Sequence, residues 1–165
     1  MKHLHIDIET YCDLDIKKVG AYKYIEDLSF EILLIAYAID DERVQVTEGT
    51  TVPIELAHAL RDPNVKKHAH NATFERLAFN RIGMTTEIGE WECSMVKAAY
   101  CGFPLGLGDV SKAMDLGNKA KLSSGTALIN YFCKPCKPTK VNGGRTRNRQ
   151  EDNPEKWEEF KGYCV

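Results

Sequence analysis

Hydrophobic and polar residues alternate between positions 3 and 9, which is the period-two pattern of a β-strand. A strongly apolar run follows at 30–39, and the acidic turn at 40–42 leads to a third short strand at 43–47. Strands joined by such short connections form antiparallel meanders. The first third of the chain is therefore predicted to build one half of a β-sheet.

Helical spacing dominates the rest of the chain. Residues 11–28 are mixed, with turn signals at Asp13 and Gly20, whereas Pro53 opens a helix that ends before Asp62. A short strand at 65–70 precedes the helix at 73–82. Further helices are expected at 93–100, 107–116, 126–132 and 154–163, with a polar Gly- and Arg-rich loop at 137–153. This order predicts an α/β fold, in which helices pack on the faces of a mixed β-sheet.

Composition restricts the class of protein. The chain has 165 residues, the size of one domain, and its 43% hydrophobic content can bury an ordinary core. No run approaches the ~20 apolar residues of a membrane span, and the N-terminus lacks the pattern of a signal peptide. We therefore expect a cytoplasmic protein without a membrane partner, whose six cysteines are reduced thiols.

The first strand carries two candidate functional residues. Asp7 and Glu9 are two positions apart, so they project from the same face of the strand. Adjacent carboxylates repel each other unless a cation compensates, and oxygen ligands favour Mg²⁺ or Mn²⁺. The pattern suggests metal-assisted phosphoryl chemistry. The alternative is an edge strand whose two carboxylates simply face water.

A second acidic candidate follows the strand at 65–70. Asn71 is a plausible helix N-cap, and Glu75 falls in the first helical turn, where the helix dipole favours a carboxylate. These roles would be purely structural. In the functional interpretation, Glu75 is a third metal ligand facing the carboxylates of the first strand, and Asn71 holds the backbone or a bound strand.

Two features of the last third of the chain remain open. Cys133 and Cys136 form a CxxC motif, but zinc would need two further ligands, and a thioredoxin-like motif would open a βαβ unit. Both interpretations are therefore disfavoured. A basic run without acidic residues could follow a nucleic-acid backbone, or could be a disordered, solvated loop. Its basic residues are Lys134, Lys137, Lys140, Arg145, Arg147 and Arg149.

Three motifs resemble those of DnaQ-like 3′–5′ exonucleases of the DEDD class, tyrosine subclass. Asp7-Ile8-Glu9-Thr10 resembles their first motif, Asn71-x-x-Phe74-Glu75 the second, and Tyr163 the start of the third. Connecting stretches at 20–22, 30–34, 102–107 and 132–135 are similar to the proofreading domains of bacteriophage family A DNA polymerases. The resemblance covers essentially the whole chain. It implies a ribonuclease H-like mixed β-sheet flanked by α-helices.

The resemblance also implies a two-metal mechanism with Mg²⁺ or Mn²⁺. Asp7 would bridge the metals, Glu9 would bind one metal and the 3′-terminal nucleotide, and Glu75 would hold the second metal. Tyr163 would orient the attacking water. The implied partners are the 3′ end of single-stranded DNA and the polymerase domain of a phage or prophage enzyme. Further contacts with the DNA strand would come from Thr10, Asn71 and Phe74.

Two departures from the family pattern shape the expected activity. Glu75 stands where aspartate is usual, and the third-motif aspartate, four residues after Tyr163, would lie beyond Val165. We therefore expect residues 1–165 to be an exonuclease-like domain, truncated at its C-terminal end and weak or inactive. The main alternative is a non-catalytic nucleic-acid-binding domain. A phosphatase fits poorly, because position 9 is glutamate where a second aspartate is expected.

Overall fold

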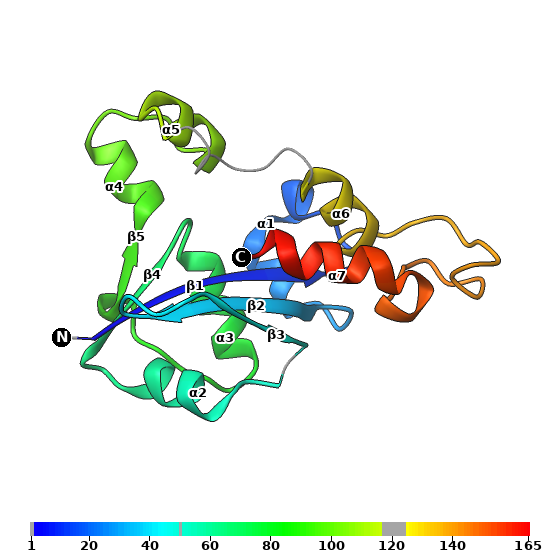
Figure 1. Ribbon diagram of the computed structural model, residues 1–165, viewed down its shortest axis with the longest axis horizontal. Helices are drawn as coiled ribbons and strands as arrows, with labels where there is room; N and C mark the ends of the chain where they lie inside the picture. Colours follow the sequence, from blue (N-terminus) through cyan, green and yellow to red (C-terminus); the bar gives the residue numbers. More distant parts are fainter. Residues whose placement is uncertain (1, 50, 117–124) are drawn as a thin grey trace.

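A five-stranded mixed sheet forms the centre of the computed structural model, which describes residues 2–49, 51–116 and 125–165 (Figure 1). The strand order is β3-β2-β1-β4-β5. Strand β2 pairs antiparallel with both β1 and β3, whereas β4 pairs parallel with β1 and β5 pairs parallel with β4. The predicted meander and α/β class are confirmed. The short β5 carried no periodic signal and was missed. The strands are β1 Lys2–Tyr11, β2 Glu31–Ile39, β3 Gln45–Glu48, β4 Val65–Ala69 and β5 Trp91–Cys93.

One face of the sheet holds the larger core. Helices α2 (Ile54–Arg61) and α3 (Thr73–Arg81) cover this face, as Figure 1 shows. Their apolar residues remove the alternating side chains of β1 from water, so the strand presents its polar residues on the opposite face. The buried side chains of this core include Leu4, Ile6, Ile8, Ile35, Leu56, Leu60 and Phe79.

The opposite face is only partly covered. Helices α6 (Gly125–Phe132) and α7 (Pro154–Tyr163) pack an aromatic cluster of Phe132, Trp157 and Phe160 over one half of this face. The other half lines a groove of about 410 Å³. Asp7 lines that groove, so a predicted functional residue lies on the uncovered half of this face. The groove is also lined by His5, Ala36, Ala38, His68 and Cys164.

A β-bulge interrupts the pairing of β1 and β2 beside the same region. Glu9 pairs with Leu34 but Thr10 pairs with Ile32, so Leu33 is an extra residue on β2. Leu33 and Leu34 both join the core under α6 and α7. Bulges reorient side chains and are common next to functional sites.

Helix α1 (Ile16–Glu26) lies where only a mixed region with turns was expected. Asp15 caps it by accepting a hydrogen bond from the Lys17 backbone N–H at 3.0 Å. Gly20 then breaks the helix with a positive φ of 77°. The break shifts the apolar residues out of a single 3.6-residue period, which explains why the sequence pattern did not reveal this helix.

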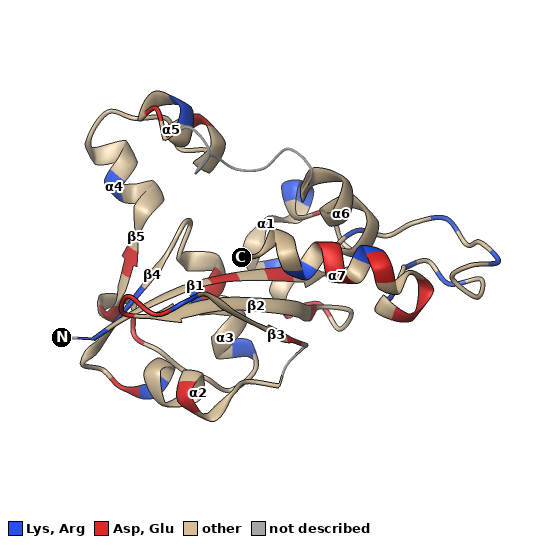
Figure 2. Cartoon of the chain, viewed as in Figure 1, with Lys and Arg blue, Asp and Glu red and all other residues tan. Residues whose placement is uncertain are grey.

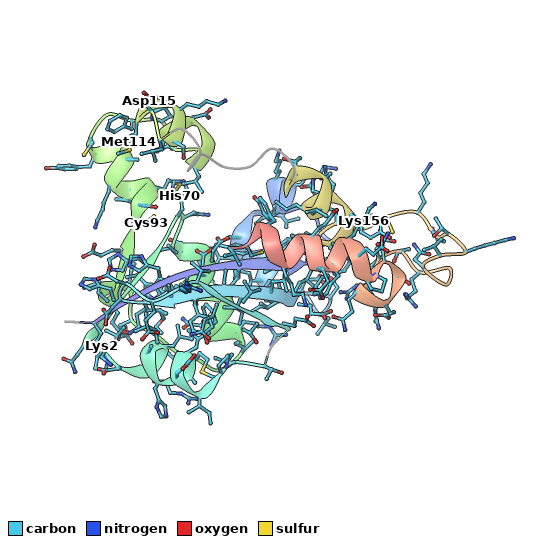
Figure 3. The ribbon with its side chains drawn as sticks, viewed as in Figure 1. Lys2, His70, Cys93, Met114, Asp115 and Lys156 are labelled. Atoms are coloured by element: carbon cyan, nitrogen blue, oxygen red, sulfur yellow. The ribbon has the colours of Figure 1, made fainter. Side chains whose placement is uncertain are left out.

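An arm of two short helices, α4 (Ser94–Tyr100) and α5 (Leu107–Ala113), extends away from the sheet in Figure 1. The His70 ring attaches the arm to the end of β4, because Nδ1 contacts Ser94 Oγ and Nε2 contacts the Leu105 carbonyl oxygen, each at 2.9 Å. Figure 3 shows His70 and Cys93 at this junction. Helix α5 is shorter than the predicted 107–116.

The remaining described helices are two 3₁₀ turns, η1 (Ile88–Glu90) and η3 (Gln150–Asp152). The second lies inside the predicted polar loop, directly before α7. In the described part of the chain, every helix is too short or too polar to reach across a lipid bilayer.

Candidate functional site

Asp7 and Glu9 lie on the partly covered face of β1, as the alternating pattern predicted. Asp7 is exposed and Glu9 is half-buried. The end of α7 approaches them: burial, followed by the charges of Glu9 and Asp7, raises the pKa of Tyr163 and of Cys164. The two strand carboxylates therefore act on the same neighbouring side chains.

Glu75 is a third carboxylate at this position, and it is almost completely buried. Only 4% of its surface is exposed, and among the described residues its Oε2 atom has no hydrogen-bond partner. Burial raises the pKa of Glu75 to about 8; its own backbone N–H partly offsets this shift, and the charge of Asp7 adds to it. Glu75 is therefore mostly protonated at neutral pH in the absence of a cation.

The turn before Glu75 differs from the expected helix cap. Helix α3 has Ala72 as its N-cap, without a side-chain hydrogen bond, so the assignment of Asn71 as N-cap is wrong. Asn71 instead occupies the left-handed region with φ of 71°. Asparagine tolerates this conformation better than most residues, and such positions are frequent at functional sites. Asn71 is exposed beside the buried Glu75.

Tyr163 occupies the last turn of α7 and faces the same carboxylates. Burial, followed by the charges of Glu9 and Asp7, raises its pKa to about 12, so the phenol keeps its proton and can donate a hydrogen bond at neutral pH. Its ring packs directly on Gly125 of α6: a Cβ atom at Gly125 would lie 2.0 Å from a ring carbon. Glycine at this position is what allows the ring to sit there.

A cavity of about 630 Å³ opens beside Glu9, within the range of small-molecule sites in proteins. It brings together Glu9 and three residues that the sequence assigned to DNA contact: Thr10, Phe74 and Lys134. Thr10 is buried, and its hydroxyl lies 3.3 Å from the Tyr24 hydroxyl. The cavity lies between α1, β1, α3 and the end of α6.

Two neighbours of the strand carboxylates were not assigned to this site from the sequence. Cys133 Sγ donates a hydrogen bond to Glu9 Oε2 at 3.7 Å, and Cys164 lines the groove that contains Asp7. From the sequence, Cys133 was assigned only to CxxC and to the family-like stretch at 132–135, and Cys164 had no role of its own. Their proximity to β1 has no local signal, because more than a hundred residues separate them from it.

The donor set has the chemistry of a hard-cation site, although no three His, Cys, Asp or Glu side chains of the described residues are grouped to hold an ion as they stand. Its donors are carboxylate oxygens, and the buried Oε2 of Glu75 is without a partner in the described regions. Binding a cation requires rotation of these side chains and loss of the Glu75 proton. Positive charge there would relieve the desolvation of Glu75 and the repulsion from Asp7.

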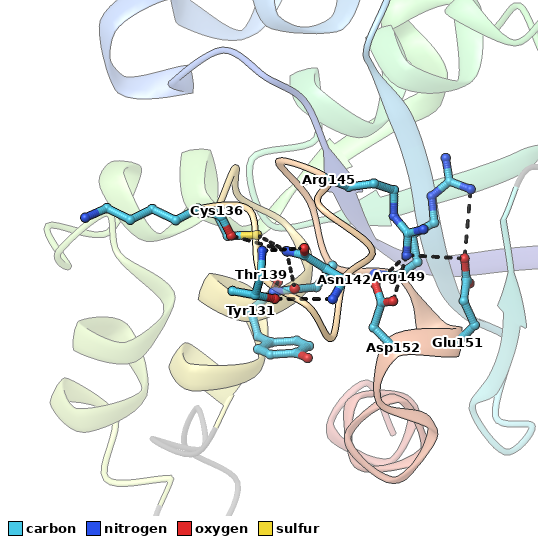
Figure 4. Close-up of polar contacts among 10 residues, drawn as sticks. Tyr131, Cys136, Thr139, Asn142, Arg145, Arg149, Glu151 and Asp152 are labelled. Atoms are coloured by element: carbon cyan, nitrogen blue, oxygen red, sulfur yellow. Dashed lines mark hydrogen bonds and ion pairs between the residues drawn. The ribbon is translucent and has the colours of Figure 1, made fainter.

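The basic loop projects from the end of the molecule near α6 and α7 (Figure 2), and its arginines are ion-paired. Arg145 makes two contacts with Asp152, at 2.7 and 2.9 Å (Figure 4). Arg147 contacts Glu31 at 2.6 Å and lies 4.1 Å above the centre of the Tyr11 ring. Arg149 has a looser contact with a neighbouring glutamate. Much of the arginine charge is thus neutralised locally.

The lysines of the same loop are different. Lys134, Lys137 and Lys140 are exposed, and within the described regions none of them forms an ion pair. Within the described regions, their charges are therefore not neutralised by a neighbouring carboxylate.

Asn142 organises the loop from inside. It is fully buried, accepts a hydrogen bond from the Thr139 N–H at 2.8 Å, and donates to the Lys137 carbonyl and to Cys136 Sγ (Figure 4). Asn142 thus gives this part of the loop internal hydrogen bonds. Cys136 points toward Asn142, whereas Cys133 points toward Glu9, so the two sulfurs of the CxxC motif have separate partners.

Comparison with known proteins adds two similarities. The whole chain is 46% identical, over 169 aligned residues, to a DNA polymerase of Bacillus phage SP02, and it spans about a quarter (26%) of the length of that polymerase. A solved structure described as the apo form of a nuclease superposes on 72% of this chain and 54% of its own, with a TM-score of 0.52 and 21% sequence identity. The latter supports the ribonuclease H-like fold. No family model matches the chain.

Proposed function

We propose that this chain is the metal-dependent 3′–5′ exonuclease part of a phage-type DNA polymerase. The observation that carries the proposal is the buried carboxyl of Glu75, whose Oε2 has no partner in the described regions and whose pKa is raised by burial and by Asp7. An unpaired buried carboxyl is costly for a fold, and a cation removes that cost. The similarity to a phage DNA polymerase supports the same assignment.

In this proposal, Asp7, Glu9 and Glu75 hold divalent cations, Mg²⁺ or Mn²⁺. Such ions supply Lewis acidity to the scissile phosphate and lower the pKa of a bound water. Tyr163 keeps its proton and orients the attacking water by a hydrogen bond. In this proposal, the three carboxylates position the cations and Tyr163 positions the water.

The cavity beside Glu9 would take the 3′-terminal nucleotide. Thr10 and Phe74 line it from β1 and α3, and Lys134 lies at its edge as a phosphate contact. Asn71, exposed in its left-handed turn, would contact the backbone of the same strand. The exposed lysines of the loop would extend the contact along the DNA.

The test is release of mononucleotides from the 3′ end of a 5′-labelled single strand in Mg²⁺. We expect weak stepwise shortening by the wild type, loss of shortening with EDTA, and loss with Asp7→Asn, which keeps the size of the side chain. Mn²⁺ titration should show weaker binding to Asp7→Asn than to the wild type. DNA binding without shortening, in Mg²⁺ or Mn²⁺, would instead identify the non-catalytic binding domain.

A further inference from the structure

Cys133, which lies at the end of α6, contacts the predicted catalytic residue Glu9 on β1. It follows α6 directly, and its backbone N–H closes the last helical turn by bonding to the Ile129 carbonyl at 2.8 Å. The side chain is buried, with 8% of its surface exposed. Its thiol donates to Glu9 Oε2 at 3.7 Å.

This contact falls at the β-bulge. The pairing of β1 with β2 shifts between Glu9 and Thr10, so regular strand pairing alone does not set the geometry there. A thiol is a hydrogen-bond donor, so a sulfur brought in from another element can help to hold the Glu9 side chain. Aromatic packing fixes the position of the sulfur, because the neighbouring Phe132 stacks on Phe160 at 5.4 Å between ring centres.

We propose that Cys133 is a positioning residue for Glu9: its S–H donates to the Glu9 carboxylate and holds that side chain in place at the bulge. This inference rests on the proposed function, since it assigns Glu9 to the reaction centre. Groups that orient metal-binding carboxylates through hydrogen bonds typically affect metal affinity or activity by about 10–100-fold when removed. Cys133 also lines the cavity beside Glu9, so a misplaced carboxylate would alter both the cation site and the nucleotide pocket.

The first experiment compares Cys133→Ala with Cys133→Ser. Both replacements are small, but only serine restores a hydrogen-bond donor. We expect Cys133→Ala to lower the affinity for Mn²⁺, and the rate of nucleotide release, by about tenfold, and Cys133→Ser to recover most of both. Equal losses in the two variants would mean that only packing matters, and would overturn the proposal.

A second measurement does not depend on activity. The infrared S–H stretch of Cys133, identified by its disappearance in Cys133→Ser, should move to higher frequency in Glu9→Ala because a hydrogen bond lowers an S–H frequency. Glu55→Ala, which removes a carboxylate from α2, should leave the band in place. An unmoved band in Glu9→Ala contradicts the proposal even if the chain is a nuclease. A shifted band with no nucleotide release in Mg²⁺ supports the contact and rejects the proposed function.

Discussion

Glu75 and Lys67 show two ways of burying an ionisable group in this molecule. Lys67 is fully buried, but its ammonium donates to Glu90 at 2.6 Å and to the Asp62 carbonyl at 2.7 Å. Such a paired charge is a structural feature. Glu75 has a carboxyl oxygen with no partner in the described regions and a neighbour, Asp7, of the same sign. This arrangement opposes folding and favours cation binding.

Replacing Glu75 with glutamine should stabilise the metal-free protein at alkaline pH. A carboxyl whose folded pKa lies near 8 and whose ordinary value is 4.5 holds its proton more tightly in the folded state. Its stabilising contribution is complete below pH 4.5 and is lost as pH rises through 8. The wild type should therefore lose stability across this window, on the order of 4 kcal/mol, and Glu75→Gln should not.

Urea unfolding in EDTA at several pH values measures this difference. Glu26→Gln, an exposed change on α1, is the matched control and should keep the pH dependence of the wild type. Parallel pH profiles for the wild type and Glu75→Gln would show that the Glu75 carboxyl is not strained. Added Mn²⁺ should stabilise the wild type more than Glu75→Gln, because glutamine removes a negative ligand.

At the scale of elements, α6 and α7 depend on close contact at Gly125. Tyr163 fills the space where a side chain at Gly125 would be. Gly125→Ala would usually favour a helix, yet here we expect a loss of about 1–3 kcal/mol from overpacking. Nucleotide release should also fall, because the Tyr163 ring would be displaced from Glu9 and Asp7.

A double-mutant cycle tests this contact. Tyr163→Ala removes the obstructing ring, so Gly125→Ala should cost much less stability in that background than in the wild type. Thr126→Ala, at the next and exposed position of α6, should have little effect in either background. If Gly125→Ala costs the same with and without the Tyr163 ring, the two residues are not coupled.

The pairing of β1 with β4 contains a stack of histidines. His3 Nδ1 lies 2.8 Å from His68 Nε2, and the His5 ring stacks on His68 with centres 4.8 Å apart. Burial lowers the pKa of His68, followed by His5; Glu92 opposes this shift, while His3 and Lys97 add to it. His68 is therefore held neutral in the folded state at pH values where the unfolded chain is already protonated.

Acidification should weaken this pair of strands. The unfolded chain binds a proton at His68 near pH 6.5, whereas the folded protein binds it only at lower pH, so stability should fall as pH drops below 6.5. Thermal unfolding of His68→Gln should depend less on pH over this range. His58→Gln, an exposed change on α2, should follow the wild type. A wild-type profile in His68→Gln would exclude the stack as the cause.

At the scale of the whole molecule, local patterns predicted most of the architecture. Alternation, helical spacing and the apolar run of β2 predicted β1 to β4 and most helices, because burial of one face, or of both faces in β2, leaves a local pattern in the sequence. They missed α1, whose period is broken at Gly20, and β5, which is only three residues long. The candidate site was predicted through its motifs. The contact of Cys133 with Glu9 was not, because contacts between distant segments leave no periodic signal.

The charged residues of the basic loop could not be told apart from the sequence. All six were predicted to contact DNA in the same way, so neutralising the arginines was expected to weaken DNA binding. The structure pairs Arg145 and Arg147 with carboxylates and leaves the lysines exposed. A cation already paired in the free protein gains less from a phosphate, because its own carboxylate must first be displaced.

Neutralising the lysines should therefore reduce single-stranded DNA binding more than neutralising the arginines. Each lysine that no longer binds a phosphate should lower the slope of log affinity against log salt by about 0.7. We expect Lys134→Gln/Lys137→Gln/Lys140→Gln to flatten that slope by as much as ~2 with little change in Tm. Replacing the three arginines by glutamine should instead lower Tm, because it breaks the ion pairs with Asp152 and Glu31.

Fluorescence anisotropy over a salt series, together with thermal unfolding of both variants, separates the two effects. A larger decrease of the salt slope in the arginine variant, with Tm unchanged, would mean that these ion pairs open to the DNA and that the arginines form the track.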